Sequence, residues 1–168
     1  HMEGHVGAVD AERAQQQWQA LRETYERLGF PVSVVEGAEG QPDMVFCANQ
    51  TLPYLETDGT RGVVLSRMHA AQRRDEVPHF ARFFEREGYA VTPLDPALDG
   101  SFEGMGDALW HPGRARLWVG HGYRTGLDAV QWLGRTLGVE TTALALLDPD
   151  FYHLDTCLCP LDEQTALV

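Results

Sequence analysis

Leu28-Gly29-Phe30, Glu87-Gly88-Tyr89 and Leu137-Gly138-Val139 mark three places where a predicted helix ends at a glycine and a strand begins. After each glycine, the chain is predicted to continue through a strand and a loop into a second strand. Units repeated at about this period normally stack on one another or form a ring around a common axis. The sequence therefore predicts an α/β (α+β) fold built from about three copies of one unit.

The predicted helices each have an apolar face at helical spacing. They cover residues 10–28, residues 76–87 and a segment that ends at residue 137. Asp10 and Asp75 are expected to cap the first two helices, and Thr125 with Asp128 is expected to form a capping box before the third. Strands are predicted at residues 30–35, 42–48, 62–67, 89–94, 116–119, 140–147 and 152–158, with a partial strand at 165–168.

Three polar residues occupy equivalent places in the three units. Asp43, Glu103 and His153 follow the junction glycines of their units by fourteen or fifteen residues. If the units form a ring, equivalent positions converge at its axis. An aspartate, a glutamate and a histidine would then share one site. This grouping suits acid–base chemistry or a cationic ligand better than it suits a core.

His153 and Asp155 are expected to point to the same face of a strand, because successive side chains alternate between faces. A carboxylate beside a histidine orients the imidazole and favours its protonated form. The alternative is a half-buried histidine with an incidental acidic neighbour. Because Glu103 occupies the equivalent position, the functional interpretation is favoured.

Two other stretches carry acidic residues. In 103–107, glycines flank Glu103 and Asp107 and allow close approach of the backbone to a ligand. The alternative is a glycine-rich turn with two solvated acids. Asp43 opens an apolar strand that Asn49 closes. Aspartate at a strand entrance commonly just forms a turn. Only its position equivalent to that of Glu103 favours a functional role for Asp43.

Basic residues form a further group, namely Arg67, Arg73, Arg74 and Arg124. Arginine binds carboxylates through two parallel hydrogen bonds. A site with acids at one end and arginines at the other would fit an amino-acid-like ligand. The alternative is that these arginines are solvated.

The composition limits the class of partner. The chain has 168 residues, 43% of them hydrophobic, and a formal net charge of −12. Nucleic-acid binding is not expected, because phosphates require clustered lysine and arginine. No apolar run approaches the length that spans a bilayer, so no membrane segment is expected. An acidic protein favours cationic small molecules.

The cysteines Cys47, Cys157 and Cys159 are odd in number, and two of them are almost adjacent, so no disulfide framework is expected. His153, Cys157 and Cys159 give His-x3-Cys-x-Cys, which lacks the Cys-x2-Cys spacing usual for structural zinc. No metal site is therefore expected. No charged-then-apolar leader is visible, so the protein is expected to be cytoplasmic.

Four motifs carry a resemblance to a known superfamily. They are Pro42-Asp43-x-Val45-Phe46, Phe102-Glu103-Gly104-x-Gly106-Asp107-Ala108-Leu109, Gly122-Tyr123-Arg124-Thr125 and Tyr152-His153-Leu154-Asp155-Thr156. Together they resemble the guanidine-modifying amidinotransferase/hydrolase (pentein) superfamily, and most nearly its dimethylarginine dimethylaminohydrolase family. The resemblance covers nearly the whole chain, with the motifs in the family's order.

This resemblance implies an α/β propeller, a five-bladed ring of ββαβ units around a central site. Residues 1–168 would then be a single incomplete domain of about three blades, the first lacking its opening strand. A cysteine nucleophile would attack the guanidinium carbon, an amine would leave, and water would resolve a covalent thiouronium intermediate.

The resemblance also implies roles for individual residues. His153 matches the family's acid–base histidine, and Glu103 matches the carboxylate that orients it. Asp43 and Asp155 match positions that hold the guanidinium. Asn49 stands where many members carry a second guanidinium-binding acid.

Arg124 and Arg67 match positions that grip the substrate carboxylate. Cys157 and Cys159 are too close to His153 in sequence to match the family's nucleophile, which is expected outside this chain. The chain alone is therefore expected to be an inactive fragment.

The expected function is hydrolysis of the guanidinium C–N bond of arginine or methylated arginine, giving citrulline and an amine. No cofactor is expected, because cysteine, histidine and carboxylates supply the chemistry. Alternatives are an amidinotransferase or arginine deiminase on the same fold, a non-catalytic module that binds a cationic metabolite, or a metal-dependent hydrolase. A small guanidino compound is the expected partner, and association into a homo-oligomer is left open.

Overall fold

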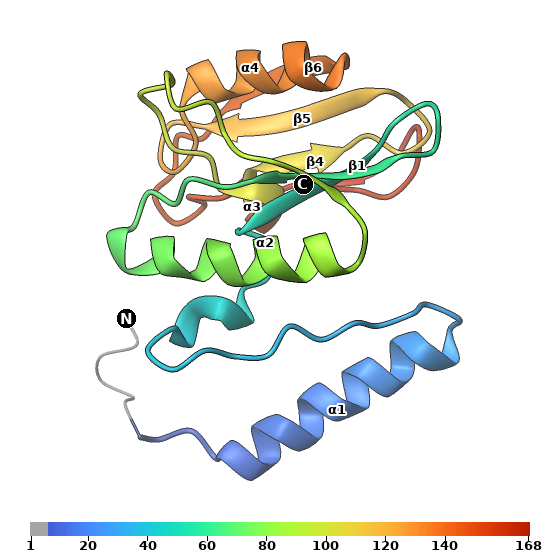
Figure 1. Ribbon diagram of the computed structural model, residues 1–168, viewed down its shortest axis with the longest axis vertical. Coiled ribbons are helices and arrows are strands. Elements are labelled where there is room, and N and C mark those ends of the chain that lie inside the picture. Colours follow the sequence, from blue (N-terminus) through green and yellow to red (C-terminus); the bar gives the residue numbers. More distant parts are fainter. Residues whose placement is uncertain (1–6) are drawn as a thin grey trace. The chain divides into compact units, whose positions relative to one another are not determined.

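A computed structural model describes residues 7–168 of the chain. The chain divides into two compact units, the first ending at Glu36 and the second covering Gly37–Val168 (Figure 1). The prediction that residues 1–168 form one incomplete domain stays a prediction.

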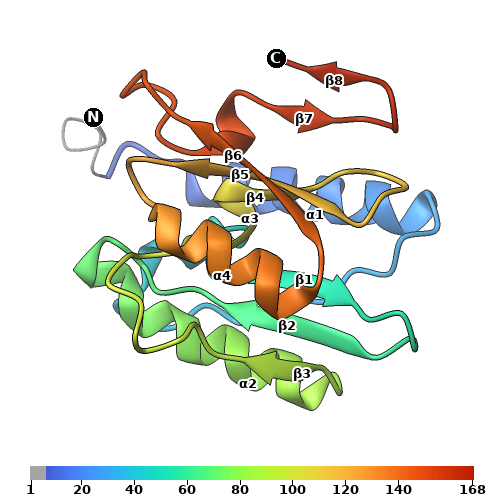
Figure 2. The same ribbon diagram turned by 90° about the horizontal axis from the view of Figure 1, so that it is seen from above.

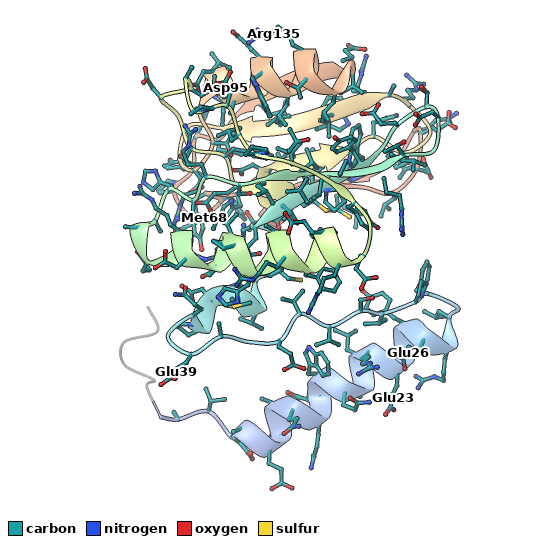
Figure 3. All side chains as sticks on the ribbon, viewed as in Figure 1. Glu23, Glu26, Glu39, Met68, Asp95 and Arg135 are labelled. Atoms are coloured by element: carbon teal, nitrogen blue, oxygen red, sulfur yellow. The ribbon has the colours of Figure 1, made fainter. Side chains whose placement is uncertain are left out.

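The first unit contains the helix α1 (Ala11–Arg27). Asp10 caps it as predicted, since its Oδ1 accepts the backbone N–H of Arg13 at 3.0 Å. Gly29, with a φ of 88°, follows the helix end. Glu26, labelled in Figure 3, forms an ion pair with Arg22 one turn earlier. The predicted strand at residues 30–35 is wrong, because no described residue of this unit pairs with the segment and an unpaired strand leaves its backbone groups unsatisfied.

The second unit contains two ββαβ repeats. In the first, β1 (Thr51–Leu55) pairs antiparallel with β2 (Arg61–Leu65). The helix α2 (Val77–Arg86) then returns the chain to β3 (Ala90–Thr92), which pairs parallel with β2. The sheet order is β1-β2-β3, so that β1 is an edge strand.

The second repeat has the same plan. Strands β4 (Ala108–Trp110) and β5 (Arg116–His121) pair antiparallel. The helix α4 (Leu127–Leu137) leads to β6 (Glu140–Ala145), which pairs parallel with β5. Figure 2 shows the short hairpin that follows, made by β7 (Cys159–Pro160) and β8 (Ala166–Leu167).

The fold is therefore a mixed α/β arrangement with a repeated unit, as predicted, although the first of the three predicted copies lacks both of its strands. The helix-to-strand junctions at Gly88 and Gly138 are confirmed, with φ angles of 79° and 64° that favour glycine. The helix α2 packs on β2 and β3, and α4 packs on β5 and β6. The main apolar core joins the two repeats and is formed by Leu52, Val64, Leu94, Phe102, Ala108, Leu117, Val119, Ala129, Val130 and Leu133.

Several local predictions were wrong. The predicted strand at residues 42–48 is the 3₁₀ helix η2 (Pro42–Val45), because proline fixes its own φ and suits the first helical turn. A second 3₁₀ helix, η3 (Ala71–Glu76), runs directly into α2, so Asp75 does not cap α2.

The predicted strand at residues 152–158 is also wrong. The backbone is extended at His153 and then turns into the 3₁₀ helix η4 (Leu154–Thr156). The predicted capping box of α4 is wrong as well: Gly126 is the N-cap, and the hydroxyl of Thr125 points to the short helix α3 (Gly104–Asp107) instead. Among residues 7–168, no helix is long and apolar enough to cross a membrane.

Candidate active site

His153 is buried at the point where the extended chain enters η4. Its backbone is fixed there, because its carbonyl oxygen accepts the hydroxyl of Thr156 at 2.6 Å and the N–H of Thr156 at 3.3 Å. The backbone that carries the imidazole is therefore fixed by its own turn.

Two carboxylates from α3 flank the imidazole. Glu103 immediately precedes α3 and Asp107 ends it, so that a spacing of four residues places both on one side of the turn. Nδ1 of His153 lies 3.3 Å from Oδ1 of Asp107, and Nε2 lies 3.2 Å from Oε2 of Glu103. Oε2 accepts no well-aligned hydrogen bond, so this second contact is an ion pair rather than a hydrogen bond. Both acids are completely buried.

This arrangement determines the protonation state of the histidine. Burial alone would lower the pKa of His153, but the bond to Asp107 and the contact with Glu103 outweigh burial and raise the pKa to about 9. Burial would raise the pKa of Glu103, but His153, the backbone N–H of His69 and the charge of Arg124 together lower it. At neutral pH the site therefore holds an imidazolium between two carboxylates.

Asp107 has its own supports. Its Oδ2 accepts the hydroxyl of Thr125 at 2.6 Å, and its Oδ1 also accepts the backbone N–H of Leu154 at 3.2 Å. The same threonine oxygen accepts the backbone N–H of Glu103 at 3.2 Å. One hydroxyl therefore ties together the two acids that hold the histidine.

Sequence reasoning did not single out Asp107 or Thr125 as site residues. Asp107 was interpreted only as part of a glycine-flanked acidic stretch, and Thr125 as a helix cap. The available signal was the spacing of four between Glu103 and Asp107, which is the spacing of residues that share one helix face.

The glycines of α3 make room for neighbouring protein groups. Gly104 has a φ of 51°, and a Cβ there would lie 2.5 Å from the carbonyl oxygen of Thr51. A Cβ on Gly106 would lie 2.3 Å from Nδ2 of Asn49 and 3.2 Å from Nδ1 of His153. The groups that approach these glycines are thus the backbone of β1 and two candidate site residues, and the predicted approach to a ligand stays a prediction.

Asn49 and Arg124 complete the immediate surroundings. Nδ2 of the buried Asn49 lies 3.4 Å from Nε2 of His153. An imidazolium has no acceptor, so these two nitrogens pack against each other without a hydrogen bond. The guanidinium of Arg124 lies 3.8 Å from Glu103 and stacks 4.8 Å from the centre of the Tyr152 ring. Arg124 thus brings a half-exposed cation to the edge of the acidic pair.

Asp43 is a predicted site residue whose side chain is not bonded to His153 or Glu103 in the described residues. Asp43 lies on η2, and its carbonyl oxygen accepts a hydrogen bond from Arg73. In the part of the chain that the structure describes, no hydrogen bond or ion pair joins its carboxylate to Glu103 or His153. The structure therefore brings Glu103 and His153 together, whereas the carbonyl oxygen of Asp43 bonds to Arg73 instead.

Asp155 and Arg67 also differ from their expected settings. Asp155 lies on η4, so it does not share a strand face with His153; partial burial raises the pKa of its carboxyl group, while the charge of His153 acts in the opposite direction. The guanidinium of Arg67 donates to the carbonyl oxygens of Asp95, Leu98 and Gly100. Arg67 thereby fastens the loop that carries Asp95, which Figure 3 labels.

All three cysteines are free in the described residues, Cys47 and Cys159 being exposed and Cys157 donating to the carbonyl oxygen of Leu154 at 3.5 Å. Within residues 7–168, no group of three histidine, cysteine or acidic side chains is arranged to hold a metal ion.

Comparison with known proteins identifies relatives of this chain. No protein-family model matches the chain. It is 42% identical over 160 residues to the bifunctional arginine dihydrolase/ornithine cyclodeaminase ArgZ of Synechocystis sp., covering 95% of this chain and 22% of that protein. It is 36% identical over 157 residues to the N(G),N(G)-dimethylarginine dimethylaminohydrolase of Mycobacterium tuberculosis, covering 94% of this chain and 48% of the relative.

A solved structure shows the same fold. A variant of the N-terminal domain of ArgZ, covalently bound to a reaction intermediate, superposes with a TM-score of 0.86 at 39% identity. The match covers 98% of this chain and 58% of that one. The chain thus spans about a fifth to a half of the length of the curated relatives named above. Over nearly all of its own length it is homologous to these hydrolases, and it belongs with them to the guanidine-modifying superfamily that its motifs resemble.

Proposed function

We propose that this chain supplies the acid–base and substrate-binding part of a hydrolase that cleaves the guanidinium C–N bond of arginine or methylated arginine. The observation that carries the proposal is His153, held as an imidazolium between Glu103 and Asp107. The relatives named arginine dihydrolase and dimethylarginine dimethylaminohydrolase support this substrate class.

The nucleophile is proposed to be a cysteine outside residues 1–168. The thiol of Cys157 donates a hydrogen bond to the carbonyl oxygen of Leu154, and Cys47 and Cys159 are exposed. In the described residues, no hydrogen bond joins a cysteine sulfur to His153. A solved ArgZ domain carries a covalently bound intermediate, which supports a covalent route for this superfamily.

The proposed reaction has two halves. The cysteine thiolate forms a bond to the guanidinium carbon, and the C–N bond to the leaving amine breaks as the imidazolium of His153 gives that nitrogen its proton. Neutral His153 then takes a proton from water as the water oxygen attacks the thiouronium carbon. The C–S bond then breaks, the hydroxyl proton of the adduct passes through solvent to the released amine, and a neutral ureido product, the thiolate and the imidazolium of His153 result.

The electrostatics of the site suit this sequence of steps. A histidine whose pKa is about 9 carries its proton at neutral pH and is ready to act first as an acid. Once it has given that proton up, Glu103 and Asp107 make it a strong base for the water step. Ionised Glu103 also suits a cationic guanidinium, and half-exposed Arg124 suits the carboxylate at the other end of an amino acid.

The remaining predicted residues take supporting places in this proposal. Asp43 and Asp155 are proposed to face the guanidinium when substrate is bound; in the described residues, neither carboxylate forms a hydrogen bond or ion pair with Glu103. Arg67 would have to release three carbonyl oxygens to grip a carboxylate, so we propose Arg124 for that task. The two ββαβ repeats and the β7–β8 hairpin would be blades of a five-bladed propeller.

The test uses the complete natural protein with arginine and dimethylarginine as separate substrates. Release of a ureido product with ammonia or dimethylamine is measured, together with the mass of any protein adduct on rapid quenching. His153→Ala should lower turnover by at least about a hundredfold, as expected for removal of an acid–base group. Near-normal turnover in His153→Ala would overturn the assignment. Arginine binding without turnover would instead support the non-catalytic binding module.

A further inference from the structure

The guanidinium of Arg73 lies at the centre of a buried polar network beside the site. Its Nε donates to both carboxylate oxygens of Glu76, at 3.1 and 3.2 Å, and one terminal nitrogen donates to Oε2 at 3.0 Å. Gln50 donates to the same carboxylate at 2.6 Å. Attraction within a buried ion pair rarely exceeds the cost of removing both charges from water, so stability is a weak explanation for this one.

The network contacts two of the candidate site segments. The other terminal nitrogen of Arg73 donates to Oδ1 of Asn49 at 3.2 Å. The nitrogen that meets Glu76 also donates to the carbonyl oxygens of Asp43 and Phe46, at 3.0 and 3.4 Å. One guanidinium therefore holds both the Asn49 side chain and the η2 segment that carries Asp43.

These contacts determine which end of the Asn49 amide faces His153. A guanidinium has five N–H donors and no acceptor, so only the amide oxygen of Asn49 can face Arg73. The amide nitrogen must then turn the other way, and it lies 3.4 Å from Nε2 of His153. Gly106 supports this pose, because any Cβ there would collide with that nitrogen at 2.3 Å.

We propose that Arg73, neutralised by Glu76, is a positioning residue that locks the Asn49 amide with its N–H donors toward His153. The effect on substrate recognition rests on the proposed function: an amide turned this way cannot accept a hydrogen bond from a guanidinium. Asn49 then differs chemically from the guanidinium-binding acid that many members of the superfamily carry at this position. It presents donors to the site, and Glu103 remains the group that faces a cation.

The sequence makes a sharp test possible, because Asn49 is the only asparagine of the 168 residues. In the complete natural protein labelled with [15N]asparagine, the side-chain amide pair of Asn49 is the pair that disappears in Asn49→Gln. In the unmodified protein we expect two well-separated amide protons, slow exchange with water, and a nuclear Overhauser contact with the His153 ring. That contact disappears in His153→Gln, which assigns it.

The variant Arg73→Met/Glu76→Met removes the clamp without leaving an unpaired buried charge. Its Asn49 amide protons should lose the contact with His153 and exchange with water at least about tenfold faster, as expected for loss of a hydrogen bond to a charged donor. The matched control is Arg116→Met/Glu140→Met, which removes an exposed pair at 2.6 Å between β5 and β6. The control should leave the Asn49 signals unchanged.

A second variant covers the case in which the double variant does not fold. Arg73→Lys keeps the charge beside Glu76, but a single ammonium cannot serve Glu76 and Asn49 together, so the same loss is expected. An absent contact with His153 in the unmodified protein, or unchanged Asn49 signals in a folded variant, would overturn the proposal. None of these signals depends on turnover, so failure of the proposed function would be seen separately.

Discussion

Oδ1 of Asp107 lies 3.3 Å from Nδ1 of His153 and also accepts the backbone N–H of Leu154 at 3.2 Å. A single oxygen therefore fixes both the imidazole and the first peptide of the turn that follows it. Because Glu103 lies at the opposite nitrogen, the ring is held between two charges of the same sign. This relationship makes His153 a charged group at neutral pH.

Stability should fall as the solution becomes alkaline. The fold raises the pKa of His153 to about 9, so the stabilisation is fully present below about pH 6.5, the ordinary value, and is lost as pH rises through about 9. We expect the free energy of unfolding in urea to drop by on the order of 3 kcal/mol across that window. In His153→Gln this part of the pH dependence should be absent, and an equally steep fall in that variant would contradict the prediction.

Acid should weaken the same site for the opposite reason. The pKa of Glu103 is lowered in the fold, so its contribution is present above the pKa of an unfolded glutamate and is lost as pH falls through the lower folded value. Glu103→Gln should therefore unfold with a smaller dependence on pH in the acidic range than the unmodified protein. Urea unfolding followed by circular dichroism at a series of acidic pH values measures this difference. Identical acid dependence in the two proteins would show that Glu103 is not held as an ion.

Thr125→Val should destabilise the chain by about 1–3 kcal/mol, because it leaves Oδ2 of Asp107 and the N–H of Glu103 buried without their shared partner. Thr125→Ser keeps the hydroxyl and is the matched control. Urea denaturation of the two variants gives the comparison. If both variants lose the same stability, the hydroxyl bridge is not responsible for the loss.

Gly106→Ala should disturb the site although it adds only one methyl group. Its Cβ would collide with Nδ2 of Asn49, which cannot move freely because Arg73 holds the same amide. Overpacking of this kind costs about 1–3 kcal/mol. Gly37→Ala, which meets nothing within 4 Å, is the control and should be nearly neutral. Thermal unfolding of both proteins, with the Asn49 amide signals recorded in parallel, separates local from global damage.

The helix-to-strand junctions were predictable because a helix, its closing glycine and the following strand are specified within one short segment. The same reasoning predicted β2, β3, β5 and β6, and it brought Glu103 and His153 together through their equivalent positions. It failed at residues 30–35, where a strand needs a partner that the described residues of that unit do not provide. The strand β1 was missed because Pro53 interrupts its pattern, which an edge strand tolerates since one side of its backbone carries no ladder bonds.

The site was harder to predict wherever its bonds join distant segments. Asp107 looked like a turn residue, and only the folded chain brings it to His153, forty-six residues later. Arg73 was one of four candidate arginines, and nothing local separates it from Arg74, yet Arg73 is buried against Glu76 while Arg74 lies at the surface. Burial and pairing decide these roles, and both arise from tertiary contacts.

The most direct test of the account is an NMR titration of the His153 ring in protein labelled with [15N]histidine, with His153→Gln to assign its signals among the 7 histidines. We expect both ring nitrogens to carry protons at neutral pH and the ring to titrate at about 9. A ring that is neutral at neutral pH, titrating at or below about 6.5, the ordinary value for histidine, would contradict the central claim that two buried carboxylates hold His153 as an acid.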